Sequence, residues 1–353
     1  MCPEIKIGNK IIGGGNPVYI IAEIGCNFED DFKRAEEMVV TAARAGADAV
    51  KFQTFIPEKL ASKDSPKFWD IEGCPGETQL EEFQAMRLLT LEEYKKLKEL
   101  ADWNKVALFS TPSDEDSVEL LEKVGVPAYK VSSMDITHFR LLSYIAKKGK
   151  PIILSTGAST LGEIKEAVSV IESQGNQQII ILHCITNYPT KIENVNLRMI
   201  LHLKREFPEY PIGYSDHTEG EESILVLSAA VALGAQVIEK HFTFDKCRPG
   251  YDHQISADPD DLKRIVANCR VIEKALGKEA KSPIDSEAKA RKYARRSLVA
   301  TRTLKKGIVL DRSMIEIKRP GTGITPNEIE KALGKTIMNN IDKDNVIRWD
   351  DLK

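Results

Sequence analysis

Hydrophobic and polar positions follow two periods along the chain from residue 18 onwards. Short and nearly continuous apolar runs predict strands that are buried on both faces. Between them, apolar residues recur every three to four positions, which predicts amphipathic helices. The predicted strands are 18–25, 49–55, 107–112, 128–133, 151–157, 179–184, 211–217 and 237–243. The predicted helices include 31–45, 91–105, 161–174 and 222–233.

Eight strand–helix units in series predict an α/β protein with a parallel sheet, and they favour a (β/α)8 TIM barrel over residues 1–277. A doubly wound open sheet is the main alternative, but the first strand-to-helix turn lacks its G-x-G-x-x-G loop. Gly13-Gly14-Gly15 comes before the first strand, and we expect it to form a hairpin turn at the floor of the barrel.

The pattern changes after Gly277. Residues 278–293 are charged and contain proline without a hydrophobic period, which predicts a linker. From residue 294 to 353 the pattern predicts a second, small domain, and about 60 residues is near the lower limit for an independent core. We therefore expect this domain to dock on another surface. Its predicted elements are strands at 297–300, 308–310, 315–318 and around 346–349, with a helix near 326–333.

Composition narrows the class of protein. The 353 residues are 42% hydrophobic and carry a net charge of −3, which disfavours nucleic acid as a partner. No apolar stretch approaches the ~20 residues of a membrane span, and residues 1–4 do not resemble the start of a signal peptide. Six scattered cysteines without a C-x-x-C pair argue against a zinc ribbon or a disulfide scaffold. We expect a soluble, cytoplasmic protein that needs no membrane.

Polar residues end all eight predicted strands. The active sites of barrel enzymes lie at the carboxyl ends of the strands, so this set predicts a functional site. An unpartnered buried polar group costs about 1–3 kcal/mol, so packing alone does not explain the set. Its members are Glu23, Lys51, Gln53, Ser110, Thr111, Lys130, Ser132, Ser133, Ser155, Thr156, His183, Cys184, Ser215, Asp216, His217, Glu239, Lys240 and His241.

Two kinds of chemistry are represented. Lys51 and Lys130, with neighbouring hydroxyls, suit a phosphate or carboxylate ligand. Each buried lysine needs an anionic partner, which a Glu, an Asp or the substrate could supply. His217 and His241 end neighbouring strands and could share one divalent metal ion, or each could be an ordinary hydrogen-bonded residue. Neither a G-x-S-x-G elbow nor a Walker-type loop is present, so serine hydrolysis and nucleotide hydrolysis are unsupported.

Seven of these strand-end segments, taken in order, closely resemble the N-acetylneuraminate (sialic acid) synthase family. That family includes the legionaminic and pseudaminic acid synthases and the spore-coat polysaccharide synthase. The resemblance continues at Asp252-His253 and at 318–324 (KRPGTGI), so it covers nearly the whole chain. The segments are 21–27 (IAEIGCN), 47–53 (ADAVKFQ), 109–112 (FSTP), 129–133 (YKVSS), 154–157 (LSTG), 214–218 (YSDHT) and 238–243 (IEKHFT).

The resemblance implies a (β/α)8 barrel followed by a small antifreeze-protein-like (SAF) domain, in a domain-swapped homodimer. It implies condensation of phosphoenolpyruvate with an open-chain N-acylated mannosamine-type sugar, which forms a nine-carbon 2-keto acid and releases phosphate with C–O cleavage. The implied cofactor is Mn²⁺, or another divalent metal such as Mg²⁺ or Co²⁺.

The resemblance also implies roles for individual residues. His217 and His241 match the metal ligands, and Arg319 matches an arginine that the small domain sends into the partner's site. The positions that match phosphoenolpyruvate-binding residues are Lys51, Thr111, Lys130, Ser132, Ser155 and Ser215. The positions around the reacting centre and the sugar are Glu23, Gln53, Tyr188, Glu239 and Asp252.

The sixth strand end departs from the family pattern. Sialic acid synthases commonly carry an Asn two residues before Tyr188, where this chain has Thr186, with Asn187 shifted by one. This departure leaves open whether the acceptor is N-acetylmannosamine, a diacetamido-trideoxy sugar or another relative. Two other readings stay open: a related synthase that acts on a phosphorylated aldose, and a non-catalytic carbohydrate-binding protein.

Overall fold

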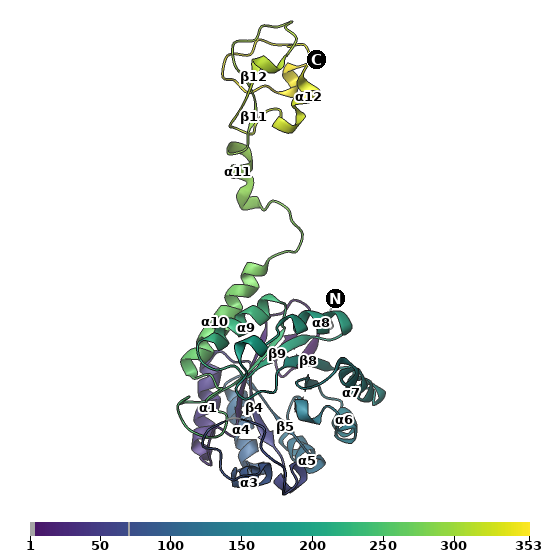
Figure 1. Ribbon diagram of the computed structural model, residues 1–353, viewed down its shortest axis with the longest axis vertical. Helices are drawn as coiled ribbons and strands as arrows, with labels where there is room; N and C mark the ends of the chain where they lie inside the picture. The colour runs from purple at the N-terminus through teal and green to yellow at the C-terminus, as the bar shows by residue number, and fades with distance from the viewer. Residues whose placement is uncertain (1–3, 70) are drawn as a thin grey trace. The chain divides into compact units, whose positions relative to one another are not determined.

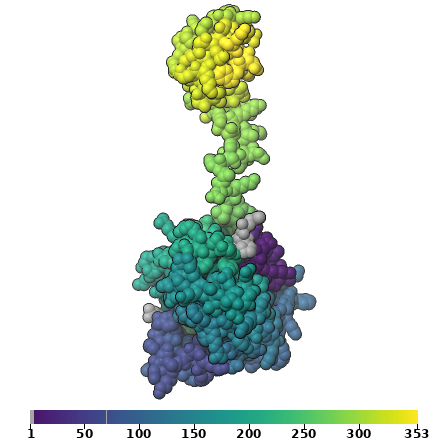
Figure 2. All heavy atoms as spheres, turned by 90° about the vertical axis from the view of Figure 1, so that its right-hand side faces the viewer, coloured from purple at the N-terminus to yellow at the C-terminus, as the bar shows by residue number. Residues whose placement is uncertain are grey.

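The structure is a computed structural model, and it describes residues 4–69 and 71–353. The chain divides into two compact units, Met1–Gly277 and Lys278–Lys353. Figure 1 traces the elements of each unit. In Figure 2 the atoms of the C-terminal part of the smaller unit, coloured yellow, pack into a rounded body.

The first unit contains a closed barrel of eight parallel strands, as the sequence predicts. The last strand pairs with the first, with Val237 opposite Tyr19, so no strand edge is left open. The strands are β3 (Tyr19–Gly25), β4 (Ala49–Thr54), β5 (Ala107–Pro112), β6 (Tyr129–Val131), β7 (Ile152–Ser155), β8 (Ile179–Cys184), β9 (Ile212–Asp216) and β10 (Val237–His241).

Helices follow the strands and surround the barrel (Figure 1). The longer helices turn an apolar stripe inward; in α4, for example, Tyr94, Leu97 and Ala101 are buried. Helices α4 and α7 begin at Thr90 and Thr160 with capping boxes that satisfy backbone N–H groups of their first turns. The helices are α1 (Phe32–Ala45), α2 (Pro57–Leu60), α3 (Gln79–Ala85), α4 (Leu91–Trp103), α5 (Glu115–Val124), α6 (Phe139–Ala146), α7 (Leu161–Ser173), α8 (Arg198–Glu206), α9 (Glu222–Ala232) and α10 (Pro259–Leu276).

A small antiparallel hairpin precedes the barrel. It pairs β1 (Ile5–Ile7) with β2 (Lys10–Ile12), and its turn is at Gly8-Asn9, where Gly8 has a φ of 57°. The expectation that Gly13-Gly14-Gly15 forms the hairpin turn is therefore wrong. These glycines follow β2, and all three adopt positive φ in the bend that leads into β3.

The smaller unit is built on a two-stranded antiparallel sheet of β11 (Ser297–Ala300) and β12 (Ile315–Lys318). Segment 278–293 contains α11 (Ala288–Tyr293), and the Lys292 carbonyl accepts a hydrogen bond of 2.9 Å from the N–H of Gly321. A helical turn follows at α12 (Ile329–Ala332). The core of the unit includes Leu298, Leu304, Leu310, Ile324, Ile337 and Ile347.

Two strands predicted in this smaller unit are absent from its described elements. Residues 308–310 form only the isolated bridge Val309–Thr336, and residues 346–349 form only the bridge Val299–Val346. Each segment thus pairs through a single residue and not through a ladder. In the part of the chain that the structure describes, none of the helices has the length and apolarity needed to cross a membrane.

Side chains along each barrel strand alternate between the interior and the surrounding helices. On β10, Glu239 and His241 face the interior, whereas Lys240 faces outward. There its Nζ lies 2.6 Å from Oδ2 of Asp216, and both side chains are buried. The hydroxyl of Tyr214 donates to Oδ1 of Asp216 at 2.9 Å. Two of the charged strand ends thus form a buried ion pair behind the barrel wall.

We predict that Lys240→Met destabilises the barrel by about 3–5 kcal/mol, because it leaves the Asp216 carboxylate buried without its cation. Urea unfolding followed by circular dichroism measures this loss. The exposed substitution Lys263→Met, on α10, is the control and should change the free energy of unfolding by less than about 1 kcal/mol. Equal stability of the two variants would contradict the prediction.

Candidate active site

A cavity of about 580 Å³ lies in the barrel unit, lined by residues from the carboxyl ends of the strands. It is lined by all thirteen barrel residues to which the family resemblance gives a role: Glu23, Lys51, Gln53, Thr111, Lys130, Ser132, Ser155, Tyr188, Ser215, His217, Glu239, His241 and Asp252. Arg319 follows β12 on the smaller unit and is exposed.

Two buried lysines and two buried glutamates form the charged floor of the cavity. Lys51 Nζ lies 2.7 Å from Glu23 Oε2 and 3.9 Å from Glu239 Oε1, and it donates to the Thr111 hydroxyl at 3.1 Å. Lys130 Nζ lies 3.8 Å from the same Glu239 oxygen. The two glutamates thus supply the negative charge that burial of two ammonium groups requires.

These contacts set the protonation of the floor. Burial alone would raise the pKa of Glu239, but Lys130 and Lys51 lower it below its usual value, so this carboxylate is ionised. Burial opposes the charge of Lys51, yet Glu23 and Glu239 raise its pKa above the ordinary lysine value. For Lys130, burial outweighs the attraction of Glu239, which lies farther away than the Glu23 partner of Lys51. The pKa of Lys130 is therefore lowered. Lys130 is therefore the cation with the less complete compensation.

Polar atoms without partners also face the cavity. The Ser155 hydroxyl and the second carboxylate oxygen of Glu239, Oε2, are both buried without a hydrogen-bond partner. Ser215 donates to the other Glu239 oxygen at 3.1 Å, and Gln53 Nε2 donates to Glu23 Oε1 at 3.2 Å. Native proteins rarely bury unsatisfied polar groups. These atoms are thus available to a ligand.

The rings of His217 and His241 lie 5.3 Å apart at the same cavity. His217 Nδ1 lies 2.8 Å from the carbonyl oxygen of Ile185, which fixes that nitrogen as the donor and leaves Nε2 with a lone pair. His241 Nδ1 lies 3.3 Å from Asp252 Oδ2. Burial and the neighbouring His241 lower the pKa of His217 to about 4. A neutral imidazole is the form that binds metals.

The donor set fits a divalent ion with two protein ligands. Within residues 4–69 and 71–353, His, Cys, Asp and Glu form no group of three or more that could hold a metal ion. An ion held by His217 and His241 would therefore take its other ligands from water or substrate. Such open positions are typical of catalytic rather than structural metal sites.

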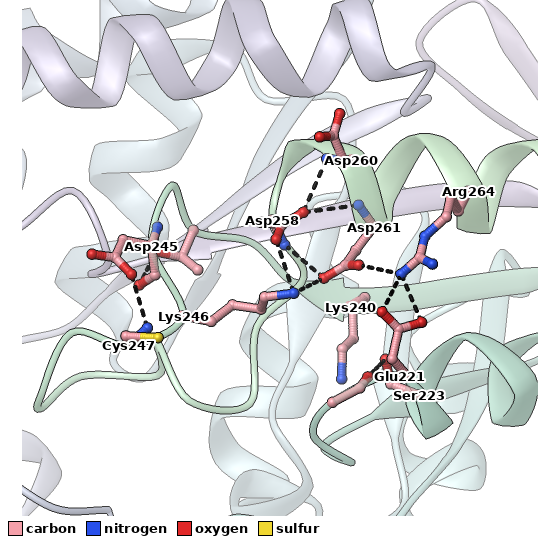
Figure 3. Close-up of polar contacts among 12 residues, drawn as sticks. Glu221, Ser223, Lys240, Asp245, Lys246, Cys247, Asp258, Asp260, Asp261 and Arg264 are labelled. Atoms are coloured by element: carbon pink, nitrogen blue, oxygen red, sulfur yellow. Dashed lines mark hydrogen bonds and ion pairs between the residues drawn. The ribbon is translucent and has the colours of Figure 1, made fainter.

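The loop after β10 carries Asp252, and ion pairs fix its ends (Figure 3). Lys246 contacts Asp261 and lies 2.8 Å from Asp258 Oδ2, and Arg264 bridges Asp261 and Glu221. These pairs join the loop to the start of α10 and to the residue before α9, so the position of Asp252 does not depend on the loop backbone alone.

Asn27 holds the other side of the same loop. Its buried side chain accepts a hydrogen bond of 3.0 Å from the Asp252 N–H and donates to the Phe242 carbonyl and to the Ser256 hydroxyl, each at 3.0 Å. The amide therefore ties the end of β10 to the turn that presents Asp252 to His241.

Other polar residues at the strand ends belong to the scaffold. His183 Nε2 lies 2.9 Å from the Val195 carbonyl oxygen, and His253 lies between the Thr243 hydroxyl and Glu29. Neither residue lines the cavity, and the same is true of Asp216.

The sequence analysis missed several cavity residues. Cys26 and Asp135 line the cavity, and the segment between β4 and α4 adds an apolar wall. Asp135 lies in a 3-10 turn beyond the fourth strand end, and the wall lies in a segment without a regular period. The one available signal was the frequency of aromatic residues in the wall: Phe55, Phe68, Trp69 and Phe83.

The fold and the site together define a barrel enzyme whose cavity combines a floor of two buried lysines and two buried glutamates with a pair of imidazoles. Residues 38–281 match the NeuB family and residues 295–353 match the SAF domain. The chain belongs to the NeuB family, whose named members are synthases of legionaminic, pseudaminic and sialic acids, and it is an enzyme.

Individual relatives align over almost the full chain. An uncharacterized protein of Methanocaldococcus jannaschii is 46% identical, over 99% of this chain and 98% of its own. The N,N'-diacetyllegionaminic acid synthase of Legionella pneumophila is 38% identical, over 98% of each. The crystal structure of N-acetylneuraminic acid synthetase from Leptospira borgpetersenii, in complex with citrate, superposes with a TM-score of 0.71 at 36% identity. That match covers 81% of this chain and 94% of the other.

We predict that Asp135→Asn stabilises the protein by about 3 kcal/mol at pH 7.5 and by less than about 1 kcal/mol near pH 4. Burial raises the pKa of Asp135 to about 6, against 3.8 in the unfolded chain. Between pH 3.8 and about 6 the native state of the wild type binds more protons than the unfolded chain does. The stability that protonated Asp135 contributes is therefore present at low pH and is lost as the pH rises through about 6. Urea unfolding at several pH values measures the difference, with exposed Asp260→Asn as the control. A parallel pH profile for Asp135→Asn and wild type would contradict the prediction.

Proposed function

We propose that this enzyme condenses phosphoenolpyruvate with an open-chain N-acylated mannosamine-type sugar, forming a nonulosonic acid and releasing phosphate. The observation that carries the proposal is the pair of buried lysines, Lys51 and Lys130, beside the two imidazoles of His217 and His241 in one cavity. The family relationship supports the class of product.

In this proposal the floor binds phosphoenolpyruvate. Lys130, whose charge is the less compensated, gains an anionic partner, and Lys51 holds the same ligand together with the Thr111 hydroxyl. The free Ser155 hydroxyl donates to the ligand, with Ser132 and Ser215 beside it. These donors stay in place as the phosphate departs, which favours C–O cleavage.

The imidazoles of His217 and His241 would hold a divalent cation, Mn²⁺ or alternatively Mg²⁺ or Co²⁺. When bound, such an ion supplies Lewis-acid polarisation of a carbonyl group. Tyr188, whose ring lies 4.3 Å from that of His217, and Asp252, beside His241, would orient the sugar aldehyde.

The reaction then balances as follows. C3 of phosphoenolpyruvate forms a C–C bond with the aldehyde carbon, and the aldehyde oxygen becomes a hydroxyl by taking up a proton. Water adds to the resulting cation at C2, and collapse of the tetrahedral adduct breaks the C–O bond to phosphate. Glu239 would stabilise the cation. Glu23, which Gln53 orients, is the leading candidate to take the proton from water, and Asp252 is the alternative.

The family resemblance adds a partner subunit. In a domain-swapped homodimer, Arg319 of one subunit would reach the N-acyl group of the sugar in the other subunit's barrel. Its exposed position after β12 supports this role, because the side chain is free to contact another surface.

We predict that phosphate release from phosphoenolpyruvate and a sugar acceptor stops in EDTA and returns on addition of Mn²⁺. His217→Ala should lose Mn²⁺ binding and activity together, because it removes one of two ligands. His202→Ala is the matched control, since His202 is an exposed histidine on α8 outside the cavity. A phosphate-release assay and Mn²⁺ titration by electron paramagnetic resonance measure both properties. Full activity in EDTA would contradict the metal site.

Glu23→Gln separates catalysis from metal binding. It should abolish turnover while Mn²⁺ binding is retained, because the Glu23 carboxylate is bonded to Lys51 and to Gln53. Near-normal turnover would remove Glu23 from the proposed proton transfer.

We predict that two inactive variants, His217→Ala and Arg319→Ala, recover activity when mixed and reassembled. In a swapped dimer with one subunit of each variant, the intact barrel receives the intact arginine, so one of the two sites is complete. Random reassembly makes about half of the dimers mixed, and about one site in four therefore becomes active. Turnover of the mixture measures this recovery. His217→Ala mixed with Glu23→Gln is the control and should stay inactive, because both changes lie in the barrel. Absence of recovery would show that each site is completed within one subunit.

A further inference from the structure

A second group of charged side chains lies beside the residues that form the cavity. Its centre is Glu29, in the loop between β3 and α1. Glu29 Oε1 lies 2.8 Å from Arg34 Nη1 and 3.0 Å from His253 Nε2, and Glu29 Oε2 contacts Arg248. We call these four residues the Glu29 cluster. None of the four lines the cavity, so the chemistry of the proposed reaction does not account for the cluster.

The backbone that carries Glu29 is strained. Glu29 has a φ of 46° and the next residue, Asp30, has a φ of 58°, both in the left-handed region that residues with a β-carbon seldom adopt. Such a conformation costs about 1–3 kcal/mol at each residue, so contacts elsewhere must offset it. The Asp30 carboxylate accepts a hydrogen bond of 2.9 Å from the Arg87 N–H. The contacts of Glu29 are those of the cluster.

The cluster reaches the loop after β10 on both sides of Asp252. Arg248 precedes Asp252 in this loop and His253 follows it directly. His253 is 1% exposed, and its Nδ1 lies 2.7 Å from the Thr243 hydroxyl. Burial lowers the pKa of His253, so its ring is neutral. Since a carboxylate only accepts hydrogen bonds, Nε2 carries the proton that faces Glu29, and Nδ1 accepts from Thr243. The ring is thus fixed at both nitrogens.

Asp252 lies between two constrained neighbours. On one side is the fixed ring of His253. On the other, Tyr251 has a φ of 49°, and its ring lies 5.8 Å from that of His253. A rotation of this turn would move Asp252 Oδ2 from its place 3.3 Å from His241 Nδ1. Loss of a carboxylate that orients a metal-binding imidazole typically lowers metal affinity about 10- to 100-fold.

We propose that Glu29 is a positioning residue of this site: through His253 and Arg248 it holds the Asp252 carboxylate against His241, in the orientation that the histidine pair needs to bind a divalent cation. The inference rests on the proposed function and adds to it a residue from outside the cavity. The strained turn at Glu29 is then the cost of joining the loop after β3 to the loop after β10.

Glu29→Gln tests the proposal, because it keeps the size of the side chain and removes its charge. The side chains of Arg34 and Arg248 are 29% and 42% exposed, so water can solvate both in the variant and the fold should remain intact. We expect the affinity for Mn²⁺, titrated by electron paramagnetic resonance without substrates, to fall about tenfold. Gln254→Ala is the matched control. Gln254 lies on the same loop, is exposed and donates to Glu219, and its replacement should leave the affinity unchanged.

A double-mutant cycle shows whether Glu29 acts through Asp252. Asp252→Asn should itself lower the affinity for Mn²⁺, and the addition of Glu29→Gln should lower it no further, because the carboxylate that Glu29 positions is already absent. Arg248→Gln removes one ion pair of the cluster from a partly exposed position and should cause a smaller loss than Glu29→Gln. An unchanged affinity in Glu29→Gln, or a loss that adds in full to that of Asp252→Asn, would overturn the inference.

Hydrogen exchange provides a readout that requires no metal. In Glu29→Gln the amides of residues 246–253, followed by mass spectrometry, should exchange about tenfold faster than in the wild type, because the turn opens more often. If the wild type binds no Mn²⁺, the proposed metal site fails, and faster exchange in Glu29→Gln still supports the positioning role. Exchange at the wild-type rate in Glu29→Gln would overturn that role whether or not the metal binds.

Discussion

Two ammonium groups lie buried at the mouth of an apolar barrel, and their compensation is the constraint on which the site depends. Neither Lys51 nor Lys130 could remain charged there without carboxylates on neighbouring strands. Glu23 and Glu239 supply that charge, and Glu239 contacts both lysines through one oxygen. Lys130 lacks a carboxylate as near as the Glu23 partner of Lys51, and burial lowers its pKa.

Barrel closure brings these residues together. Because strands β9, β10, β3 and β4 are neighbours in the sheet, residues that are distant in sequence end at the same rim. Side-chain alternation then separates two functions: Glu239 and His241 enter the cavity, while Lys240 between them pairs with Asp216 behind it. One strand thus lines the cavity with one face and forms a buried ion pair with the other.

Much of the fold and of the polar site could be predicted from the sequence, because both follow from strong periodic signals. Continuous apolar runs marked the eight strands, and the strand ends marked the floor and the histidine pair. The predicted ends of the strands were less exact. The strand predicted at 128–133 stops at Val131 as β6, and Ser133 already begins a 3-10 turn. Asp216 was grouped with the cavity residues, but its side chain points outward from β9, away from the cavity. The shape of the apolar wall between β4 and α4 could not be predicted, since it depends on tertiary contacts such as Trp69 with Glu82 and not on a local period.

We propose that one cavity holds a divalent metal at two imidazoles and phosphoenolpyruvate at two lysines. Anomalous diffraction at the manganese edge, from crystals grown with Mn²⁺ and phosphoenolpyruvate, locates both ligands in one experiment. We expect an anomalous peak bonded to Nε2 of both His217 and His241, with the phosphate of phosphoenolpyruvate within hydrogen-bonding distance of Lys130. A manganese peak elsewhere, or phosphoenolpyruvate bound away from both lysines, would contradict it.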